Sequence, residues 1–276
     1  MSALPVVAVM SGGGVKAIAH VGAMRALGEA NLAPTHFIGT SMGAAVAAGF
    51  AAGLSPDEVE ARLREIRRRD VAAVSPVALA KGLYATAILK GEPLRESLER
   101  FIPVQHFSDL DHPLTVTATD MDSGELVRFG FDGSAVPLVD AVYASCALPL
   151  LYPPARIGGR RLADGGLRGV VALEVARQVP ARLVIAIDVG PGFDMEARAA
   201  GKGPPPAIRV HNEAQWVMMA DSTRLQVALW RATPGLPPLL YVRPTVRHGA
   251  TFDLTQSDYY LEQGYLATRQ ALAALA

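Results

Sequence analysis

The stretch Phe37-Ile38-Gly39-Thr40-Ser41-Met42-Gly43 decides how this chain folds and what chemistry it offers. An apolar run precedes the serine and an Ala-rich run follows it to about Ala52, which predicts a strand, a tight turn and a helix. A Gly-x-Ser-x-Gly turn holds its serine strained and exposed, and Gly39 and Gly43 avoid collisions with neighbouring backbone. Because the helix aims its first N–H groups at the Ser41 hydroxyl, the pattern favours a nucleophile over an ordinary turn.

The start of the chain repeats this arrangement. We predict a strand over Val6–Met10, a turn at Gly12-Gly13-Gly14 and a helix over Val15–Glu29. Two strand–turn–helix units in succession predict an α/β fold with a mainly parallel central sheet and helices on its faces. The backbone N–H groups of the glycine turn are able to form an oxyanion hole. A phosphate loop is the rival interpretation, but Lys16 is followed by Ala17, and neither nucleotide-binding pattern is complete.

The rest of the chain alternates between strands and helices. Apolar and β-branched runs predict strands at Leu114–Thr119, Leu126–Phe129, on both sides of Gly158-Gly159, at Val184–Val189 and at Leu239–Val242. Helices are predicted from Ser55-Pro56 onward, over Asn212–Trp230 and over Ser257–Leu275, with a surface loop at Gly190–Pro206. Residues Pro76–Pro103 lack a clear period, which indicates short helices or a cap over the sheet.

A serine nucleophile needs a base, and the sequence offers two. Asp164 opens Asp164-Gly165-Gly166 after a predicted strand, where the turn would present its carboxylate at a sheet end; a purely turn-stabilising role is the alternative. Asp188 and His248 follow in the order that a Ser-Asp-His triad requires. His20 lies in the first predicted helix, where we expect a packed or capping role. No cluster of His, Asp and Glu has metal-ligand spacing.

Composition narrows the class of protein. The net charge of +0 over 276 residues argues against a nucleic-acid partner. Cys146 is the only cysteine, so no internal disulfide forms, and we expect it to pack as a small hydrophobe. The N-terminus lacks a signal-peptide pattern and no apolar run reaches bilayer length, so we expect a cytoplasmic enzyme. Peripheral membrane contact stays open, since five arginines between Arg62 and Arg69 form either a solvated face or a lipid-contacting one.

Four stretches together resemble the patatin-like phospholipase family. Ser11-Gly12-Gly13-Gly14-Val15-Lys16-Ala17 is similar to its oxyanion block, although Lys16 and Ala17 stand where arginine and glycine are common. Gly39-Thr40-Ser41-Met42-Gly43 is similar to its nucleophile elbow, and Asp164-Gly165-Gly166 to the block with its catalytic aspartate. Ala144-Ser145-Cys146-Ala147-Leu148-Pro149 is a further matching block. The resemblance covers nearly the whole chain and implies a single patatin-like domain over residues 1–276.

The resemblance implies a three-layer α/β/α sandwich and a Ser-Asp dyad without histidine. Ser41 would attack a lipid ester, Asp164 would accept its proton, and the N–H groups of the segment from Gly12 to Val15 would hold the oxyanion. No metal or cofactor is required by this route. The apolar segments Pro76–Leu89 and Ala147–Tyr152 are candidates for an acyl groove, with core packing as the alternative.

Two other functions remain open from the sequence. One is an α/β-hydrolase-type esterase with a triad of Ser41, Asp188 and His248. The other is a non-catalytic module of the same fold that binds acyl chains or a partner protein. The motifs do not specify the oligomeric state or the lipid head group.

Overall fold

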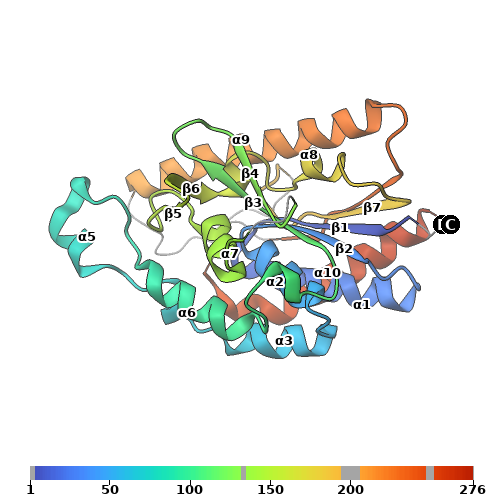
Figure 1. Ribbon diagram of the computed structural model, residues 1–276, viewed down its shortest axis with the longest axis horizontal. Coiled ribbons are helices and arrows are strands. Elements are labelled where there is room, and N and C mark those ends of the chain that lie inside the picture. Colours follow the sequence, from blue (N-terminus) through green and yellow to red (C-terminus); the bar gives the residue numbers. More distant parts are fainter. Residues whose placement is uncertain (1–3, 132–134, 194–205, 247–251, 276) are drawn as a thin grey trace.

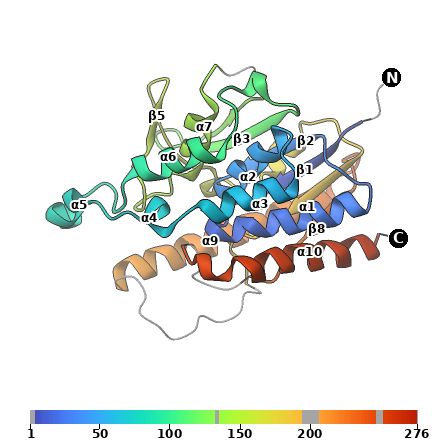
Figure 2. The same cartoon turned by 90° about the horizontal axis from the view of Figure 1, so that it is seen from below.

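The protein is a three-layer α/β/α structure with its sheet between two layers of helices (Figure 1). The computed structural model describes residues 4–131, 135–193, 206–246 and 252–275. The predicted α/β/α class and its mainly parallel sheet are therefore confirmed. Both chain ends lie at one end of the long axis, and the short helix α5 (Pro76–Lys81) stands out at the other (Figures 1 and 2).

The sheet has the strand order β5-β6-β3-β2-β1-β7-β8, and β4 also pairs with β3. The strands are β1 (Val6–Met10), β2 (His36–Thr40), β3 (Leu114–Asp120), β4 (Leu126–Phe129), β5 (Ala155–Ile157), β6 (Arg160–Asp164), β7 (Leu183–Ile187) and β8 (Leu239–Val242). Strands β3, β2, β1, β7 and β8 run parallel to one another. The hairpin β5–β6 and strand β4 join β3 antiparallel. The strands predicted at Leu114–Thr119 and Leu126–Phe129, and those on both sides of Gly158-Gly159, therefore pair as two hairpins.

The central strands are apolar on both faces because helices cover both faces. Val6, Ala8 and Met10 of β1 enter one core, whereas Val7 and Val9 enter the other. Strand β7 alternates in the same way between the two cores. This period of two explains why the sequence shows unbroken apolar runs instead of an alternation with polar residues.

The two helical layers differ in size (Figure 1). One layer holds α1 (Ala19–Glu29), α2 (Met42–Ala51), α3 (Pro56–Glu65), α6 (Gly91–Phe101), α7 (Leu138–Cys146) and α10 (Ser257–Ala273). The other holds α8 (Leu173–Ala176) and α9 (Pro206–Ala232). The short helices are α4 (Arg68–Val71), α5 (Pro76–Lys81), η1 (Gly14–Ile18), η2 (Gly82–Tyr84), η3 (Phe107–Asp109), η4 (Gly165–Leu167) and η5 (Leu254–Gln256). None of the described helices combines the length and hydropathy that a membrane span needs.

Several boundaries differ from the prediction for local reasons. The first helix begins as the 3-10 turn η1, because Gly14 takes a positive φ of 61° before the chain enters α1. Helix α9 begins at Pro206, earlier than predicted, and most of the predicted Gly190–Pro206 loop lies outside the described residues. Helix α3 begins at Pro56 as predicted, and Ser55 caps it in a capping box with Glu58.

The two arginines of α3 form hydrogen bonds and ion pairs with other parts of the protein. Arg62 donates hydrogen bonds to the carbonyls of Arg100 and Phe101 at 3.1 Å. Arg64 pairs with Glu60 at 2.7 Å and with Asp258 at 2.5 Å. This favours the structural interpretation of that helix over a lipid-contacting one.

Candidate active site

Ser41 lies at the junction of β2 and α2, in the strained conformation that the motif predicts. Its φ is 55° and its ψ is −135°, which is uncommon for a residue with a side chain. A Cβ on Gly43 would lie 2.3 Å from the carbonyl oxygen of Ser11, and a Cβ on Gly39 would lie 2.4 Å from the Cα of Ala44. Both glycines are therefore required by close backbone approach.

The Ser41 backbone is fixed from the neighbouring helix. Its N–H donates to the Oγ of Ser145 in α7 at 2.7 Å, so this amide already has an acceptor. The carbonyl of Ser41 accepts from the Ala44 N–H at 2.8 Å. These two bonds hold the elbow while the hydroxyl faces the pocket.

The Gly-rich loop after β1 lies beside the serine because β1 and β2 are parallel neighbours. Met10 pairs with Gly39, so the residues that follow each strand emerge together. A Cβ on Gly12 would lie 2.9 Å from the Cβ of Ser41. The Gly12 N–H donates to the Val170 carbonyl at 3.3 Å. This loop therefore places glycine backbone against Ser41, and the amide of Gly12 is bonded to Val170.

The amides of the next residues are better placed as donors. Gly14 and Val15 open the 3-10 helix η1, and the first N–H groups of a helix have no acceptor within it. Gly13 precedes them, and a Cβ there would lie 2.9 Å from the Val189 carbonyl oxygen. Of the four predicted oxyanion residues, Gly13, Gly14 and Val15 thus fit a donor role and Gly12 fits a spacing role.

Ser11 and His20 brace the Gly-rich loop from behind. The Ser11 hydroxyl accepts from the Val189 N–H at 2.8 Å, and the Ser11 carbonyl lies 3.0 Å from Nε2 of His20. Burial lowers the pKa of His20 to about 4, so the imidazole is neutral and donates from Nε2. The expected packed role of His20 is therefore a specific one, because it fixes the carbonyl next to Gly12.

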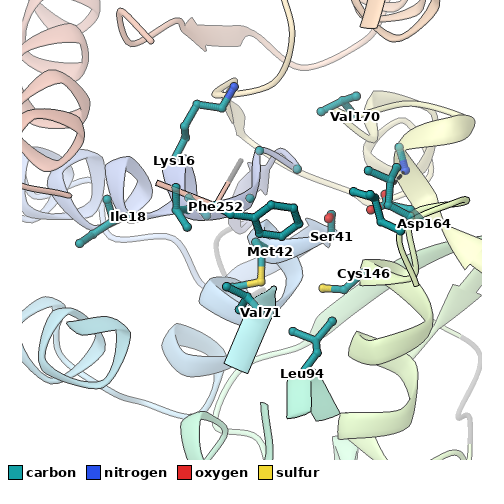
Figure 3. Close-up of a pocket in the computed structure, with 18 of the residues that line it drawn as sticks. Lys16, Ile18, Ser41, Met42, Val71, Leu94, Cys146, Asp164, Val170 and Phe252 are labelled. Atoms are coloured by element: carbon teal, nitrogen blue, oxygen red, sulfur yellow. Dashed lines mark hydrogen bonds between the residues drawn. The ribbon is translucent and has the colours of Figure 1, made fainter. Parts of the chain in front are cut away.

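Asp164 reaches the same place from the antiparallel side of the sheet. Thr40 of β2 pairs with Thr117 of β3, and the next residue of β3, Ala118, pairs with Asp164. Because Ser41 directly follows Thr40, the side chains of Ser41 and Asp164 lie at the same level along the sheet. Figure 3 shows Ser41 and Asp164 at one pocket wall.

The Asp164 carboxylate is buried and hydrogen-bonded. Its Oδ1 accepts from the Gly166 N–H at 2.7 Å, and its residue is 4% exposed. Burial raises its pKa to about 6, and hydrogen bonds from the Gly166 amide and the Ser41 hydroxyl oppose that rise. Gly165 has no room for a side chain, because a Cβ there would lie 2.5 Å from the Thr117 carbonyl oxygen. Most Asp164 carboxylates are therefore ionised at neutral pH and near the pKa that suits a general base.

Cys146 is a member of the site that the sequence prediction missed. It ends α7 and lines the pocket together with Ser41 (Figure 3). Burial raises the pKa of its thiol well above the usual value, and the charge of Asp164 adds to the rise. The thiol is therefore protonated. The small apolar residues around Cys146 in the sequence do not indicate that it lies in the pocket, because its position depends on where α7 ends.

The pocket at Ser41 is apolar and has a volume of about 120 Å³. Its apolar lining includes Ile18, Met42, Leu63, Ile66, Val71, Leu94, Leu148, Leu151, Tyr152, Val170, Trp216, Met219, Phe252 and Leu254. Residues 148–152 thus contribute to the predicted groove. In contrast, Val77 and Leu79 from the predicted Pro76–Leu89 lining are 61% and 74% exposed and are not part of the pocket wall.

Lys16 lines the same pocket as a buried cation. It is 6% exposed, and its pKa is lowered to about 8, chiefly by burial and also by the positive charge of Arg243. The carboxylate of Asp188 opposes this shift. Lys16 therefore carries its charge at neutral pH, close to the Gly-rich loop.

The second candidate base, Asp188, has a different setting. Its carboxylate accepts from the Tyr241 hydroxyl at 2.6 Å and the Gly190 N–H at 2.9 Å, and it pairs with Arg243 at 3.1 Å. It lines another cavity, together with Arg224 and Arg231, and not the pocket of Ser41. His248, its predicted triad partner, lies outside the described residues.

The fold and the site combine a mainly parallel sheet, covered on both faces, with a strained Gly-x-Ser-x-Gly turn beside a Gly-rich loop, and comparisons with known proteins identify the family. The family model described as Patatin-like phospholipase matches residues 8–177. An uncharacterized NTE family protein of Mycobacterium tuberculosis is 31% identical over 201 residues, which cover 71% of this chain and 53% of that protein. Human patatin-like phospholipase domain-containing protein 6 is 32% identical over 183 residues, covering 66% of this chain and 13% of that protein. This chain belongs to the patatin-like phospholipase family, as its motifs predict.

Solved structures share the fold. VipD from Legionella pneumophila has a TM-score of 0.59 at 16% identity, covering 99% of this chain and 67% of that one. The type III effector protein ExoU has a TM-score of 0.52 at 15% identity, covering 98% of this chain and 53% of that one. The chain spans about half the length of the mycobacterial relatives and a small part of the human one.

Proposed function

We propose that the chain is a serine acyl hydrolase that cleaves fatty-acyl esters of lipids through a dyad of Ser41 and Asp164. The observation that carries the proposal is that Ser41, in its strained turn, and the buried Asp164 carboxylate line one apolar pocket. An apolar pocket suits an acyl chain, and the adjacent carboxylate suits removal of a proton from the hydroxyl.

The first half of the reaction transfers the acyl group to the enzyme. The Ser41 Oγ attacks the ester carbonyl carbon while its proton passes to the Asp164 carboxylate. The amides of Gly13, Gly14 and Val15 hold the negative oxygen, and each such donor contributes about 3 kcal/mol in the transition state. The intermediate then expels the alcohol, which takes the proton from Asp164. An acyl ester on Ser41 remains.

The second half of the reaction releases the fatty acid. A water molecule attacks the acyl ester and passes a proton to Asp164. The same amides hold the oxyanion, and the intermediate collapses to the free acid as the Ser41 oxygen regains the proton. The pKa of about 6 suits both directions of proton transfer near neutral pH.

The experiment that tests this proposal compares hydrolysis of a soluble short-chain ester and of a phospholipid. Ser41→Ala and Asp164→Asn should each lose activity by at least about a hundredfold. His248→Ala should retain it. If His248→Ala is inactive and Asp164→Asn is active, the alternative triad is correct. If wild type and Ser41→Ala bind fatty acid equally and neither hydrolyses any ester, the chain is a non-catalytic module.

A further inference from the structure

A projecting arm stands between α4 and α6. We use "the arm" for residues 72–90, which carry α5 and η2. Its two legs are joined at their base: Val74 forms a β-bridge with Leu89, and the Lys90 N–H donates to the Ala73 carbonyl at 2.8 Å. Both views show α5 standing away from the body, at the end of the long axis opposite both termini (Figures 1 and 2).

The tip of the arm exposes large apolar side chains. Val77 is 61% exposed, Leu79 is 74% exposed and Tyr84 is 91% exposed. Val77 and Leu79 lie in α5 and Tyr84 ends η2, so all three occupy one short stretch of chain. Such a cluster on a projection exposes apolar surface without contributing to either core, which is typical of an interaction site.

The charge of the arm selects the kind of partner. From Val71 to Gly91 the sequence has no Asp or Glu, whereas Lys81 and Lys90 both lie in this stretch. Both lysines are exposed. An apolar tip with cationic flanks and no acid is complementary to an anionic lipid surface, where each lysine near the surface contributes to binding.

The arm is also attached to the wall of the Ser41 pocket. The Ile88 N–H donates to the Leu150 carbonyl at 2.9 Å, and the Leu89 N–H donates to the Leu151 carbonyl at 2.8 Å. Leu151 and Tyr152 line the pocket, and the Tyr152 hydroxyl donates to the carbonyl of Val71, next to the arm. If the tip of the arm binds a partner surface, this wall of the pocket is therefore kept close to the same surface.

We infer that the arm docks the protein onto an anionic lipid bilayer, with Val77, Leu79 and Tyr84 entering the interface. This inference deepens the proposed function, because a bilayer is the place where a lipid ester is found. The arm does not touch the reacting atoms. It brings the pocket wall to the surface from which the acyl chain enters.

The test measures binding of the Ser41→Ala protein to sedimentable vesicles, so that hydrolysis cannot alter them. Vesicles contain equal parts phosphatidylcholine and phosphatidylserine, or phosphatidylcholine alone. The double change Leu79→Glu with Tyr84→Glu should weaken binding to the mixed vesicles at least about tenfold. Lys81→Gln should weaken it about fivefold and should leave binding to pure phosphatidylcholine unchanged. Leu275→Glu, at a site 55% exposed beyond α10, is the matched control and should bind normally.

The same double change in the active enzyme should leave hydrolysis of a soluble short-chain ester unchanged and reduce hydrolysis of vesicle lipid. Equal vesicle binding by the double variant and the parent overturns the inference. The inference is also overturned if the parent does not bind vesicles but forms a dimer that the double change dissociates, because the arm would then bind a second copy of the chain. Vesicle binding without Ser41-dependent hydrolysis overturns the proposed function alone.

Discussion

Replacing Asp164 by Asn should stabilise the folded protein at neutral pH while it removes activity. The pKa of the carboxyl rises from 3.8 to about 6 on folding, chiefly because of burial. The folded chain therefore binds this proton more tightly than the unfolded chain does. The contribution of Asp164 to the free energy of unfolding falls as pH rises from about 4 to about 6, and it stays low above that range.

The size of the effect follows from the same two pKa values. Their difference corresponds to about 3 kcal/mol at 1.36 kcal/mol per pH unit, and this net value already includes the hydrogen bonds that oppose the effect of burial. Asn keeps an oxygen that accepts from the Gly166 N–H and has no charge to bury. We therefore expect Asp164→Asn to raise the free energy of unfolding at pH 7 by about 1–3 kcal/mol, with little change at pH 4.

Urea unfolding of both proteins at pH 4 and pH 7 measures this difference. Asp122→Asn is the matched control, because Asp122 is an exposed carboxyl whose pKa Arg161 lowers by hydrogen bonding. The control should not gain stability at pH 7. An Asp164→Asn protein that is less stable than wild type at pH 7 would refute the description of Asp164 as a buried, costly charge.

Other perturbations have distinct expected outcomes. Gly43→Ala, whose Cβ would lie 2.3 Å from the Ser11 carbonyl oxygen, should lower activity at least about tenfold and cost about 1–3 kcal/mol of unfolding free energy. Gly28→Ala, with nothing within 4 Å of its Cβ, should be neutral or stabilising in the same unfolding and activity measurements. The kcat/KM of wild type for a soluble ester should fall about tenfold per pH unit below about pH 6, as Asp164 protonates; a limb near pH 4 would contradict its raised pKa. Lys16→Met should reduce hydrolysis of an anionic phospholipid more than that of an uncharged ester. This difference between the two substrates should shrink above about pH 8, where Lys16 loses its proton. Equal losses of hydrolysis for both substrates at pH 7 would contradict a role for the charge of Lys16.

Local geometry made the nucleophile elbow predictable from the sequence. Gly39 and Gly43 are needed because of backbone atoms a few residues away or on the adjacent strand, so the short motif already contains the constraint. The same holds for the start of α3 at Ser55 and Pro56. The two strand–turn–helix units predicted a sheet with helices on its faces, and two cores cover it.

The meeting of Ser41 and Asp164 depends on strand register, which a one-dimensional pattern does not contain. Asp164 arrives through an antiparallel strand that pairs with β3, and its level relative to Ser41 is set by the pairing of Ala118. The family resemblance supplied the pairing as a hypothesis. The residues alone left both Asp164 and Asp188 as candidates for the base, and only the fold shows that they line different cavities.

Two features were out of reach for a different reason. The apolar residues of the arm have the composition of a pocket lining, and only the bridge at its base shows that its tip points away from the body. The lowered pKa of Lys16 depends chiefly on its burial by the fold and also on Arg243, which is distant in the chain. In both cases the decisive contact is long-range, so no local period or motif could indicate it.

The most direct test of the account is the rate at which a fluorophosphonate labels Ser41, followed by mass spectrometry of the labelled peptide. The dyad predicts rapid labelling at Ser41 in wild type and in His248→Ala, and labelling at least about a hundredfold slower in Asp164→Asn. Fast labelling of Asp164→Asn, or a loss of labelling in His248→Ala, would contradict the claim that Asp164 takes the proton from Ser41.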